Sequence, residues 1–305
     1  MPTLRVHRPG LLATVQDLGR PGMGRFGVSP SGAMDPLALR VANRLVGNAD
    51  GAAALEITAV GPEIEFCERT RFALTGANLS AALDGEPLAP WRSQIASAGQ
   101  RLTFGARRQG ARSYLAVAGG IVAPRVFGSA AADLEAGLGA PPLRAGDALE
   151  IGPSRPAAVR EASPALLRAY ADPFELRMVA DESSEPAPEL LATFTGAAYR
   201  VSERSNRMGF RLEGPALADT GGERLSEPSP PGTIQAPPGG EPILLMADRP
   251  TVGGYRRLGC VIAADLPKAG QLWIGHRVRF RVVSVAEARA ALVALAALLE
   301  KAVMA

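Results

Sequence analysis

The chain has 305 residues, of which 47% are hydrophobic and 21% are charged, and its formal net charge at pH 7 is +3. These proportions are ordinary for globular proteins and exclude a wholly disordered chain. The length predicts one large or two medium-sized domains, and the small net charge gives no reason to expect a nucleic acid partner.

A predicted helix ends the first glycine-rich stretch, which runs from residue 14 to residue 48 as TVQDLGRPGMGRFGVSPSGAMDPLALRVANRLVGN. Asp35 followed by Pro36 predicts the helix start, because a carboxylate caps free backbone N–H groups and proline fits the first helical position. Gly47-Asn48 predicts a left-handed cap at the other end. This half of the stretch has a purely structural explanation.

The half before the helix admits two interpretations. It is rich in glycine and also contains Gln16, Asp17, Arg20 and Arg25. Glycine allows sharp turns and close backbone approach, and a loop leading into a helix can present N–H groups to an anion. The segment is therefore either a structural corner in which Asp17 pairs with Arg20, or part of a site.

Residues 55–152 consist mostly of short segments in which apolar and polar residues alternate, as they do in strands. Gly61-Pro62 and Asp84-Gly85 predict hairpin turns within this region. Many short strands without long intervening helices favour an antiparallel sandwich or barrel.

Residues 152–173 interrupt this pattern with proline, alanine and charged residues, and they predict a linker that carries a short helix. A second strand-rich run follows. We therefore expect a mainly β protein of two strand-rich domains, residues 1–172 and 173–305, with a boundary near Asp172. The first domain contains the glycine-rich loop and the short helix.

The C-terminal stretch VAEARAALVALAALLEKAVMA is rich in alanine and leucine and predicts a helix. We expect this helix to pack on the second domain or on a partner chain. Membrane attachment is a poor alternative, because the polar face is not basic and the apolar residues 290–299 are too few to span a bilayer. The apolar stripe at helical spacing comprises Leu292, Leu295, Leu299 and Val303.

Several common kinds of site are excluded by the sequence. It contains no GxxxxGK[ST] phosphate loop and no GxSxG nucleophile motif. Cys67 and Cys260 lack CxxC spacing, and His7 and His276 are the only histidines, so we expect neither a disulfide framework nor a metal site. The first residues lack the apolar core of a signal peptide, and we expect a cytoplasmic protein.

Two loop-rich segments of the second domain predict a polar pocket, since strand-end loops commonly carry amide, carboxylate and hydroxyl groups. The structural alternative is that residues 237–240 form a plain turn and that Asp248 and Arg249 form a surface ion pair. The segments are SNRMGFRLEG (205–214) and GTIQAPPGGEPILLMADRPTVGGYRRLG (232–259), and their candidate site residues are Asn206, Arg207, Arg211, Gln235, Asp248, Thr251, Gly253, Gly254 and Tyr255.

The motifs TVQDLGRPG, GVSPSGAMD, SNRMGFRLEG, GTIQAPPGGEPILLMADRPTVGGY and ADLPKAGQL span almost the whole chain in this order. They resemble the KipA family, which is also known as allophanate hydrolase subunit 2, as the C component of 5-oxoprolinase, and as the biotin-dependent carboxyltransferase family. The resemblance implies two largely β domains with a cyclophilin-like barrel. It also implies a chain that works in a heteromeric complex.

The resemblance implies three alternative functions. In the first, the chain is the C component of an amidohydrolase that uses ATP to hydrolyse 5-oxoproline to glutamate, together with a KipI-like B component and an A component. In the second, it is a carboxyltransferase component that transfers a carboxyl group from carboxybiotin to urea or a related amide. Neither Lys268 nor Lys301 has a biotin-attachment context, so carboxybiotin would have to come on another chain. In the third, it is a KipA-like, non-catalytic antagonist of a KipI-like kinase inhibitor.

The resemblance also implies roles for individual residues. Asp17, Asp248 and Tyr255 are the predicted catalytic residues, and the glycine-rich loop is expected to face the subunit interface. Arg207 and Arg211 are expected to hold a substrate carboxylate or phosphate. ATP is expected as a cofactor, bound either by this chain or at the partner interface. We also expect a small amide or lactam substrate, no metal, no nucleic acid and no membrane. The predicted substrate-binding residues are Gln16, Arg20, Asp35, Asn206, Arg207, Arg211, Gln235, Thr251, Gly253 and Gly254.

The segment GSAAADLEAGLGAPP, residues 128–142, departs from the family pattern. Ala130, Ala131 and Ala132 replace residues that are usually polar, and Glu135 replaces an arginine. If this segment contacts phosphate in the family, the replacements predict weaker phosphate binding by this chain.

Overall fold

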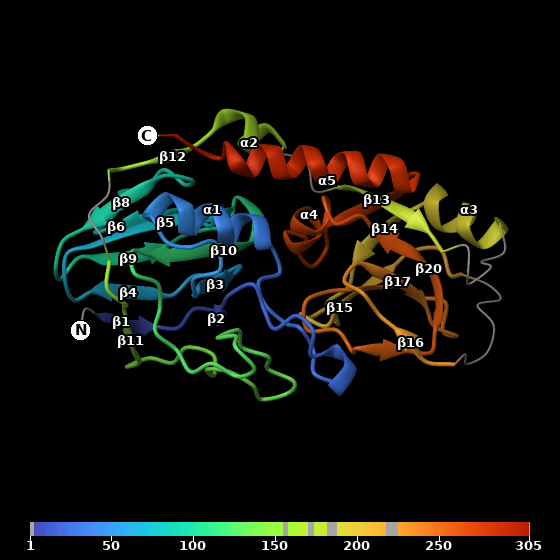
Figure 1. Cartoon of the computed structure of the whole chain (residues 1–305), viewed down its shortest axis with the longest axis horizontal. Helices are drawn as coiled ribbons and strands as arrows, with labels where there is room; N and C mark the ends of the chain where they lie inside the picture. Colours follow the sequence, from blue (N-terminus) through green and yellow to red (C-terminus); the bar gives the residue numbers. More distant parts are fainter. Residues whose placement is uncertain (1–2, 155–157, 170–173, 182–187, 218–224, 305) are drawn as a thin grey trace. The chain divides into compact units, whose positions relative to one another are not determined.

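The structure is a computed structural model that describes residues 3–154, 158–169, 174–181, 188–217 and 225–304. The chain divides into two compact units (Figure 1). Unit 1 comprises residues 1–20, 31–169 and 298–305, and unit 2 comprises residues 21–30 and 170–297.

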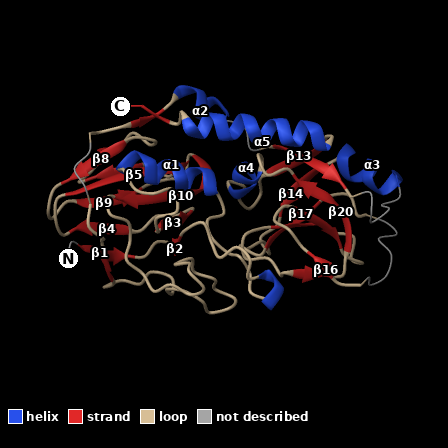
Figure 2. Cartoon of the chain, viewed as in Figure 1, coloured by secondary structure: helices blue, strands red, loops and turns tan. Residues whose placement is uncertain are grey.

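Both units are built mainly from strands, which confirms the predicted fold class (Figure 2). The predicted domain boundary near Asp172 lies outside the described residues. Each compact unit is discontinuous in sequence. The segment 21–30 of the glycine-rich loop belongs to unit 2, and the last residues, 298–305, belong to unit 1.

Unit 1 is a sandwich of two antiparallel sheets that share one core. The six-stranded sheet contains, in spatial order, β11 (Ala148–Glu150), β1 (Thr3–Arg8), β4 (Glu63–Phe66), β9 (Arg101–Phe104), β6 (Ala81–Leu83) and β7 (Glu86–Pro87). The five-stranded sheet contains β2 (Leu12–Gln16), β3 (Ala54–Thr58), β10 (Gln109–Val117), β5 (Thr70–Asn78) and β8 (Ser93–Ala96). Core residues from the two sheets include Leu4, Ile64, Phe66, Leu55, Phe72 and Leu115.

The short helix of unit 1, α1 (Pro36–Val46), begins and ends where the sequence predicts. The Asp35 carboxylate accepts a hydrogen bond of 2.9 Å from the Ala38 N–H, and Gly47 has a left-handed φ of 84°. The helix contacts β5 and β10 of the five-stranded sheet (Figure 1). This cover explains why every residue of β10 after Gln109 is buried, since the strand lies between the core and the helix.

One predicted hairpin of unit 1 is confirmed and one is wrong. Asp84 and Gly85 have φ angles of 50° and 87° and join β6 to β7, as a two-residue turn of this type requires. The turn at Gly61-Pro62 joins β3 to β4, but these strands lie in different sheets. The chain crosses the sandwich there because Ala59 has a φ of 57° and Gly61 lies against the Phe104 ring.

Unit 2 contains a closed barrel, as the resemblance implies. Its neighbouring strands are antiparallel except for the parallel pair β13–β21. In order around the barrel, the strands are β13 (Glu175–Ala180), β20 (Arg256–Val261), β17 (Thr233–Ala236), β18 (Ile243–Leu245), β15 (Gly209–Glu213), β14 (Ala198–Val201) and β21 (Arg277–Val282). A separate pair consists of β16 (Glu227–Pro228) and β19 (Val252–Gly253). The other short elements are η1 (Gly24–Phe26), α2 (Pro164–Ala169), α3 (Pro188–Gly196) and α4 (Leu266–Gly270).

The C-terminal helix α5 (Val285–Glu300) packs on unit 2, through Ala288, Ala291 and Leu295. The predicted stripe is wrong in part, because Leu292 is 47% exposed. Val303 lies beyond the helix in β22 (Val303–Met304), which pairs with β12 (Glu161–Ala162). Among the described helices, none has the length and apolar character needed to cross a membrane.

Gly119→Ala is expected to destabilise unit 1 more than Gly85→Ala. Both glycines have positive φ, of 97° and 87°, but a Cβ on Gly119 would lie 2.0 Å from the Gly152 carbonyl oxygen, while one on Gly85 would meet nothing within 4 Å. The left-handed backbone alone costs an alanine about 1–2 kcal/mol. Overpacking against the backbone adds about 1–3 kcal/mol. Urea unfolding of the two variants measures the difference, and equal midpoints would contradict this account of Gly119.

Candidate functional site

The Asp17 carboxylate organises a buried polar cluster in unit 1. Asp17 follows β2 directly and is 4% exposed. One oxygen accepts hydrogen bonds from the Gly19 N–H at 2.8 Å and the Ser129 hydroxyl at 2.6 Å. The other accepts from the Ala130 N–H at 2.7 Å and lies 3.8 Å from the Arg125 guanidinium. Asp17 therefore fixes the start of the segment 128–142 against the end of β2.

Arg20 does not pair with Asp17, so the structural interpretation of this corner is wrong in that detail. The Arg20 side chain is 1% exposed, and its Nη2 donates to the Ala131 carbonyl. Its Nε is 3.5 Å from the Val126 carbonyl oxygen. Its Nη1 has no hydrogen-bond partner among the described residues. Arg20 and Asp17 thus hold different backbone groups of the same segment.

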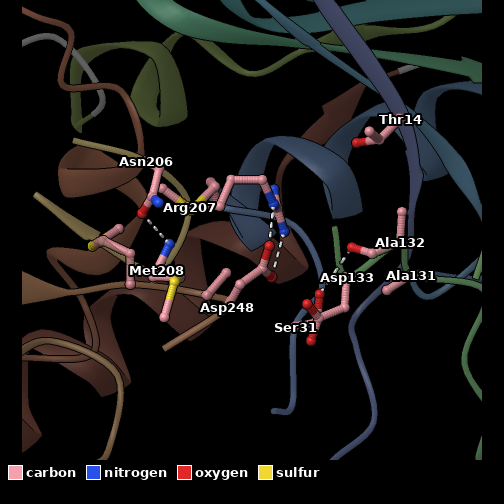
Figure 3. Close-up of polar contacts among 12 residues, drawn as sticks. Thr14, Ser31, Ala131, Ala132, Asp133, Asn206, Arg207, Met208 and Asp248 are labelled. Atoms are coloured by element: carbon pink, nitrogen blue, oxygen red, sulfur yellow. Dashed lines mark hydrogen bonds and ion pairs between the residues drawn. The ribbon is translucent and has the colours of Figure 1, made fainter. Parts of the chain in front are cut away.

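Gln16, the last residue of β2, contacts the same segment from its wholly buried position. Its Nε2 donates to the Thr14 hydroxyl at 3.1 Å and to the Ala132 carbonyl at 3.0 Å. The Ser31 hydroxyl donates to that carbonyl too, at 3.0 Å (Figure 3). Gln16 Oε1 is buried without a hydrogen-bond partner in the described part of the chain.

Asp133 joins this cluster, although it is absent from the residues predicted from the sequence. It is 2% exposed, and its Oδ1 accepts from the Ala136 N–H at 3.1 Å. Its Oδ2 is buried and has no partner among the residues described. The one sequence signal for Asp133 was its position directly after three consecutive alanines. Those alanines, Ala130 to Ala132, are buried and bind the cluster through their backbone groups.

Asp35, a predicted substrate-binding residue, lies wholly buried at the start of α1. Its own N–H donates to the Tyr114 hydroxyl at 2.8 Å, and that hydroxyl donates to Glu56 at 2.6 Å. Burial, with the charges of Glu56 and Asp35, holds the pKa of Tyr114 well above its ordinary value, so the hydroxyl keeps its proton. Glu56 also accepts from the Met34 N–H at 2.8 Å. This network gives Asp35 a structural role, and its contact with substrate stays a prediction.

Unit 2 has its own buried polar pair, Arg207 and Asp248. The two side chains form a bidentate ion pair with distances of 2.7 Å and 3.0 Å, and the residues are 7% and 4% exposed (Figure 3). The Asp248 N–H also donates to the Arg207 carbonyl at 3.0 Å. A surface pair of Asp248 with Arg249 is therefore the wrong interpretation. Arg249 is 8% exposed, burial lowers its pKa, and its Nε donates to the Ser229 carbonyl at 2.6 Å.

Gln235 and Gly253 lie close together in unit 2. Gln235, in β17, is 5% exposed, and its Nε2 has no hydrogen-bond partner among the described residues. A Cβ on Gly253 would lie 2.4 Å from that Nε2 and 3.3 Å from the Ser229 hydroxyl, which is also buried without a described partner. The bare glycine is therefore needed for the close approach of the Gln235 amide.

Other predicted residues of unit 2 lie nearer the surface. Asn206 is exposed and closes a turn by accepting from the Met208 N–H at 2.9 Å. Arg211 is exposed on β15, and Tyr255 is 42% exposed. Arg207 and Arg211 therefore differ in environment, the first buried in an ion pair and the second facing solvent. Gly254 lies between Gly253 and Tyr255 and is half-buried.

The segment 21–30 packs on unit 2. The Ser29 hydroxyl donates to the Ala247 carbonyl at 3.3 Å, and a Cβ on Gly24 would lie 4.0 Å from the Thr251 methyl carbon. The Arg25 guanidinium lies 4.7 Å from the centre of the 64% exposed Phe26 ring. The glycine-rich loop thus supplies residues to both units. In the described ranges, no group of three His, Cys, Asp or Glu side chains is arranged to hold a metal ion.

Asp248→Ala is expected to destabilise unit 2 strongly. The change leaves the buried Arg207 without its bidentate partner, which typically costs about 3–5 kcal/mol of the free energy of unfolding. Glu241→Ala is a matched control, because Glu241 forms an exposed ion pair with Arg204, and such pairs contribute about 0–1 kcal/mol. Urea unfolding measures both effects, and a similar small loss in the two variants would contradict a structural role for the buried pair.

Residues 26–282 match the family described as carboxyltransferase domain, subdomain A and B. The chain is 42% identical over 294 residues to the C subunit of 5-oxoprolinase from Escherichia coli, with 93% of each chain covered. It is 38% identical over 290 residues to the C subunit of 5-oxoprolinase from Haemophilus influenzae, with 90% of each covered.

A solved structure supports the same relationship. The crystal structure of Kluyveromyces lactis urea carboxylase superposes with a TM-score of 0.87 at 28% identity. The match covers 98% of this chain but 29% of that one, so the chain spans less than a third of the urea carboxylase. The resemblance inferred from the motifs is confirmed, and the chain belongs to the family of the carboxyltransferase domain, subdomains A and B.

Proposed function

We propose that the chain is the C component of a 5-oxoprolinase-type complex, which hydrolyses the lactam 5-oxoproline to glutamate. The observation that carries the proposal is the 42% identity to a protein of that name, over 93% of both chains. A component of this kind implies further subunits. We propose that these are a KipI-like B component and an A component, and that the chain acts only together with them.

Each unit of the chain contains buried polar side-chain atoms without a hydrogen-bond partner among the described residues, and we take these atoms as candidate ligand contacts. In unit 2, Gln235 Nε2 is a donor without a partner among the described residues, and it is suited to a substrate oxygen. Asp248 is held rigidly by Arg207, and we assign it a positioning role in addition to the predicted catalytic one. The exposed Tyr255 side chain is open to a ligand or to another protein of the complex.

In unit 1, the Asp17 carboxylate already accepts three hydrogen bonds from Gly19, Ser129 and Ala130. We propose that Asp17 positions the segment 128–142, which brings buried backbone and side-chain groups together. ATP is assigned to the assembled complex, at the partner interface, because the sequence has no phosphate-binding loop and the alanine run offers no polar side chains.

A second candidate is carboxyl transfer, which the family description and the likeness to urea carboxylase favour. In that reaction, carboxybiotin on another chain supplies the carboxyl group to urea or a related amide. Both candidates require recognition of a small amide. They differ in the co-substrate, ATP with 5-oxoproline in one case and carboxybiotin with urea in the other.

Purified chain, mixed with its KipI-like B component and the A component, is expected to hydrolyse ATP faster in the presence of 5-oxoproline and to release glutamate. Gln235→Leu is expected to lower kcat/KM for 5-oxoproline about 10-fold, because a lost hydrogen bond to substrate costs about 1.5 kcal/mol. Its unfolding midpoint is expected to stay unchanged or to rise, since Nε2 has no described partner to lose.

Gln94→Leu is the control for this experiment, because Gln94 is a half-buried glutamine on β8. A stable three-component complex that shows no response to 5-oxoproline would refute the first candidate. Carboxylation of urea by that complex with carboxybiotin would then establish the second.

A further inference from the structure

Three buried side chains of unit 1 each retain a polar atom without a hydrogen-bond partner in the part of the chain that the structure describes. These atoms are Gln16 Oε1, Arg20 Nη1 and Asp133 Oδ2. The three residues are 0%, 1% and 2% exposed. An unsatisfied buried polar group typically costs about 1–3 kcal/mol, so three in one place require an explanation.

The three side chains surround one short piece of backbone. Gln16 Nε2 donates to the Ala132 carbonyl at 3.0 Å, and Arg20 Nη2 donates to the neighbouring Ala131 carbonyl. Asp133 is the next residue of that backbone (Figure 3). Gln16 and Arg20 thus contact two consecutive residues of the backbone stretch that Asp133 directly follows.

Gln16 and Asp133 are already fixed by their other polar atoms. The Gln16 amide orientation follows from its two acceptors, the Ala132 carbonyl and the Thr14 hydroxyl, because only the NH₂ group can donate to both. Asp133 is held through Oδ1 by the Ala136 N–H at 3.1 Å. The remaining atoms are therefore set in place before any ligand binds, which is the arrangement expected of a binding site.

The chemistry of the three atoms selects an amide. Arg20 Nη1 is a donor, while Asp133 Oδ2 and Gln16 Oε1 are acceptors. The charges of Arg20 and Asp133 cancel, so the group does not favour an anion such as phosphate. An amide has a carbonyl oxygen that accepts and an N–H that donates, and it is neutral.

We propose that Gln16, Arg20 and Asp133 bind the amide group of the substrate, an inference that rests on the proposed function for its physiological ligand. Arg20 Nη1 donates to the carbonyl oxygen, and Asp133 Oδ2 accepts from the amide N–H. Gln16 Oε1 accepts a second N–H where the ligand has one, as in a urea, and a water in the case of a lactam. A guanidinium at the carbonyl oxygen also stabilises negative charge that develops there during reaction.

Ligand entry then requires the segment 128–142 to open. The segment is held at its start by Asp17 and farther along by Arg20 and Gln16, while its residues 134–137 are exposed. A ligand would bind next to the hydrogen bonds of the Ala131 and Ala132 carbonyls. Under this proposal, Asp133 is the substrate-binding residue that the segment 128–142 itself supplies.

Asp133→Asn in the reconstituted complex is expected to raise KM for 5-oxoproline at least 10-fold while kcat changes less. The asparagine has nearly the same shape but carries an NH₂ group, which can present a donor where Oδ2 accepts. Asp147→Asn is the matched control, because Asp147 caps a turn through the Arg144 N–H at 2.7 Å and is not one of the described residues with a buried, unpartnered side-chain atom. An altered unfolding midpoint with an unchanged KM would show that Oδ2 only holds a structural water, and would overturn the proposal.

Calorimetry on the complex separates this proposal from the proposed function. The probes are urea, 2-pyrrolidinone as a lactam without a carboxylate, and glutamate as an acid without an amide. Binding of urea or 2-pyrrolidinone that Asp133→Asn weakens at least 10-fold supports the amide site even if 5-oxoproline is not turned over. Turnover of 5-oxoproline with no effect of Asp133→Asn on KM or on amide binding leaves the proposed function standing and refutes the amide site.

Discussion

The hydrogen bonds of the Asp17 carboxylate are the interaction on which the polar cluster of unit 1 depends. They connect residues 112 positions apart in the sequence, because the Ser129 hydroxyl donates to a residue that follows β2. The carboxylate is almost wholly buried, so its charge must be satisfied by hydrogen bonds. The segment 128–142 supplies two of them, and it is thereby held where Gln16 and Arg20 reach its carbonyl groups.

Unit 2 uses a buried ion pair for the same purpose. Arg207 and Asp248 come from loops that are 41 residues apart, and their bidentate contact fixes both loops relative to the barrel strands. A buried pair of this kind adds little net stability compared with apolar residues, but removal of one partner is costly. Its value is therefore positional, since Asp248 lies three residues before Thr251, which directly precedes the strand β19.

The features that the sequence predicted correctly depend on neighbouring residues. The Asp35 cap of α1 and the Asp84-Gly85 turn each follow from a few adjacent side chains and backbone angles. The prediction of a hairpin at Gly61-Pro62 was wrong, because the alternation of apolar and polar residues identifies strands but not the sheet to which each strand belongs.

The sequence likewise predicted only part of the polar cluster of unit 1. The motifs indicated Gln16, Asp17 and Arg20, but no local pattern marked Asp133 as buried. Its environment is created by contacts across more than a hundred residues of sequence, such as that of Gln16 with Ala132, 116 positions away. Replacement of polar residues by the alanine run does not remove the cluster, because the backbone supplies its hydrogen bonds. These contacts therefore do not depend on which side chains occupy residues 130–132.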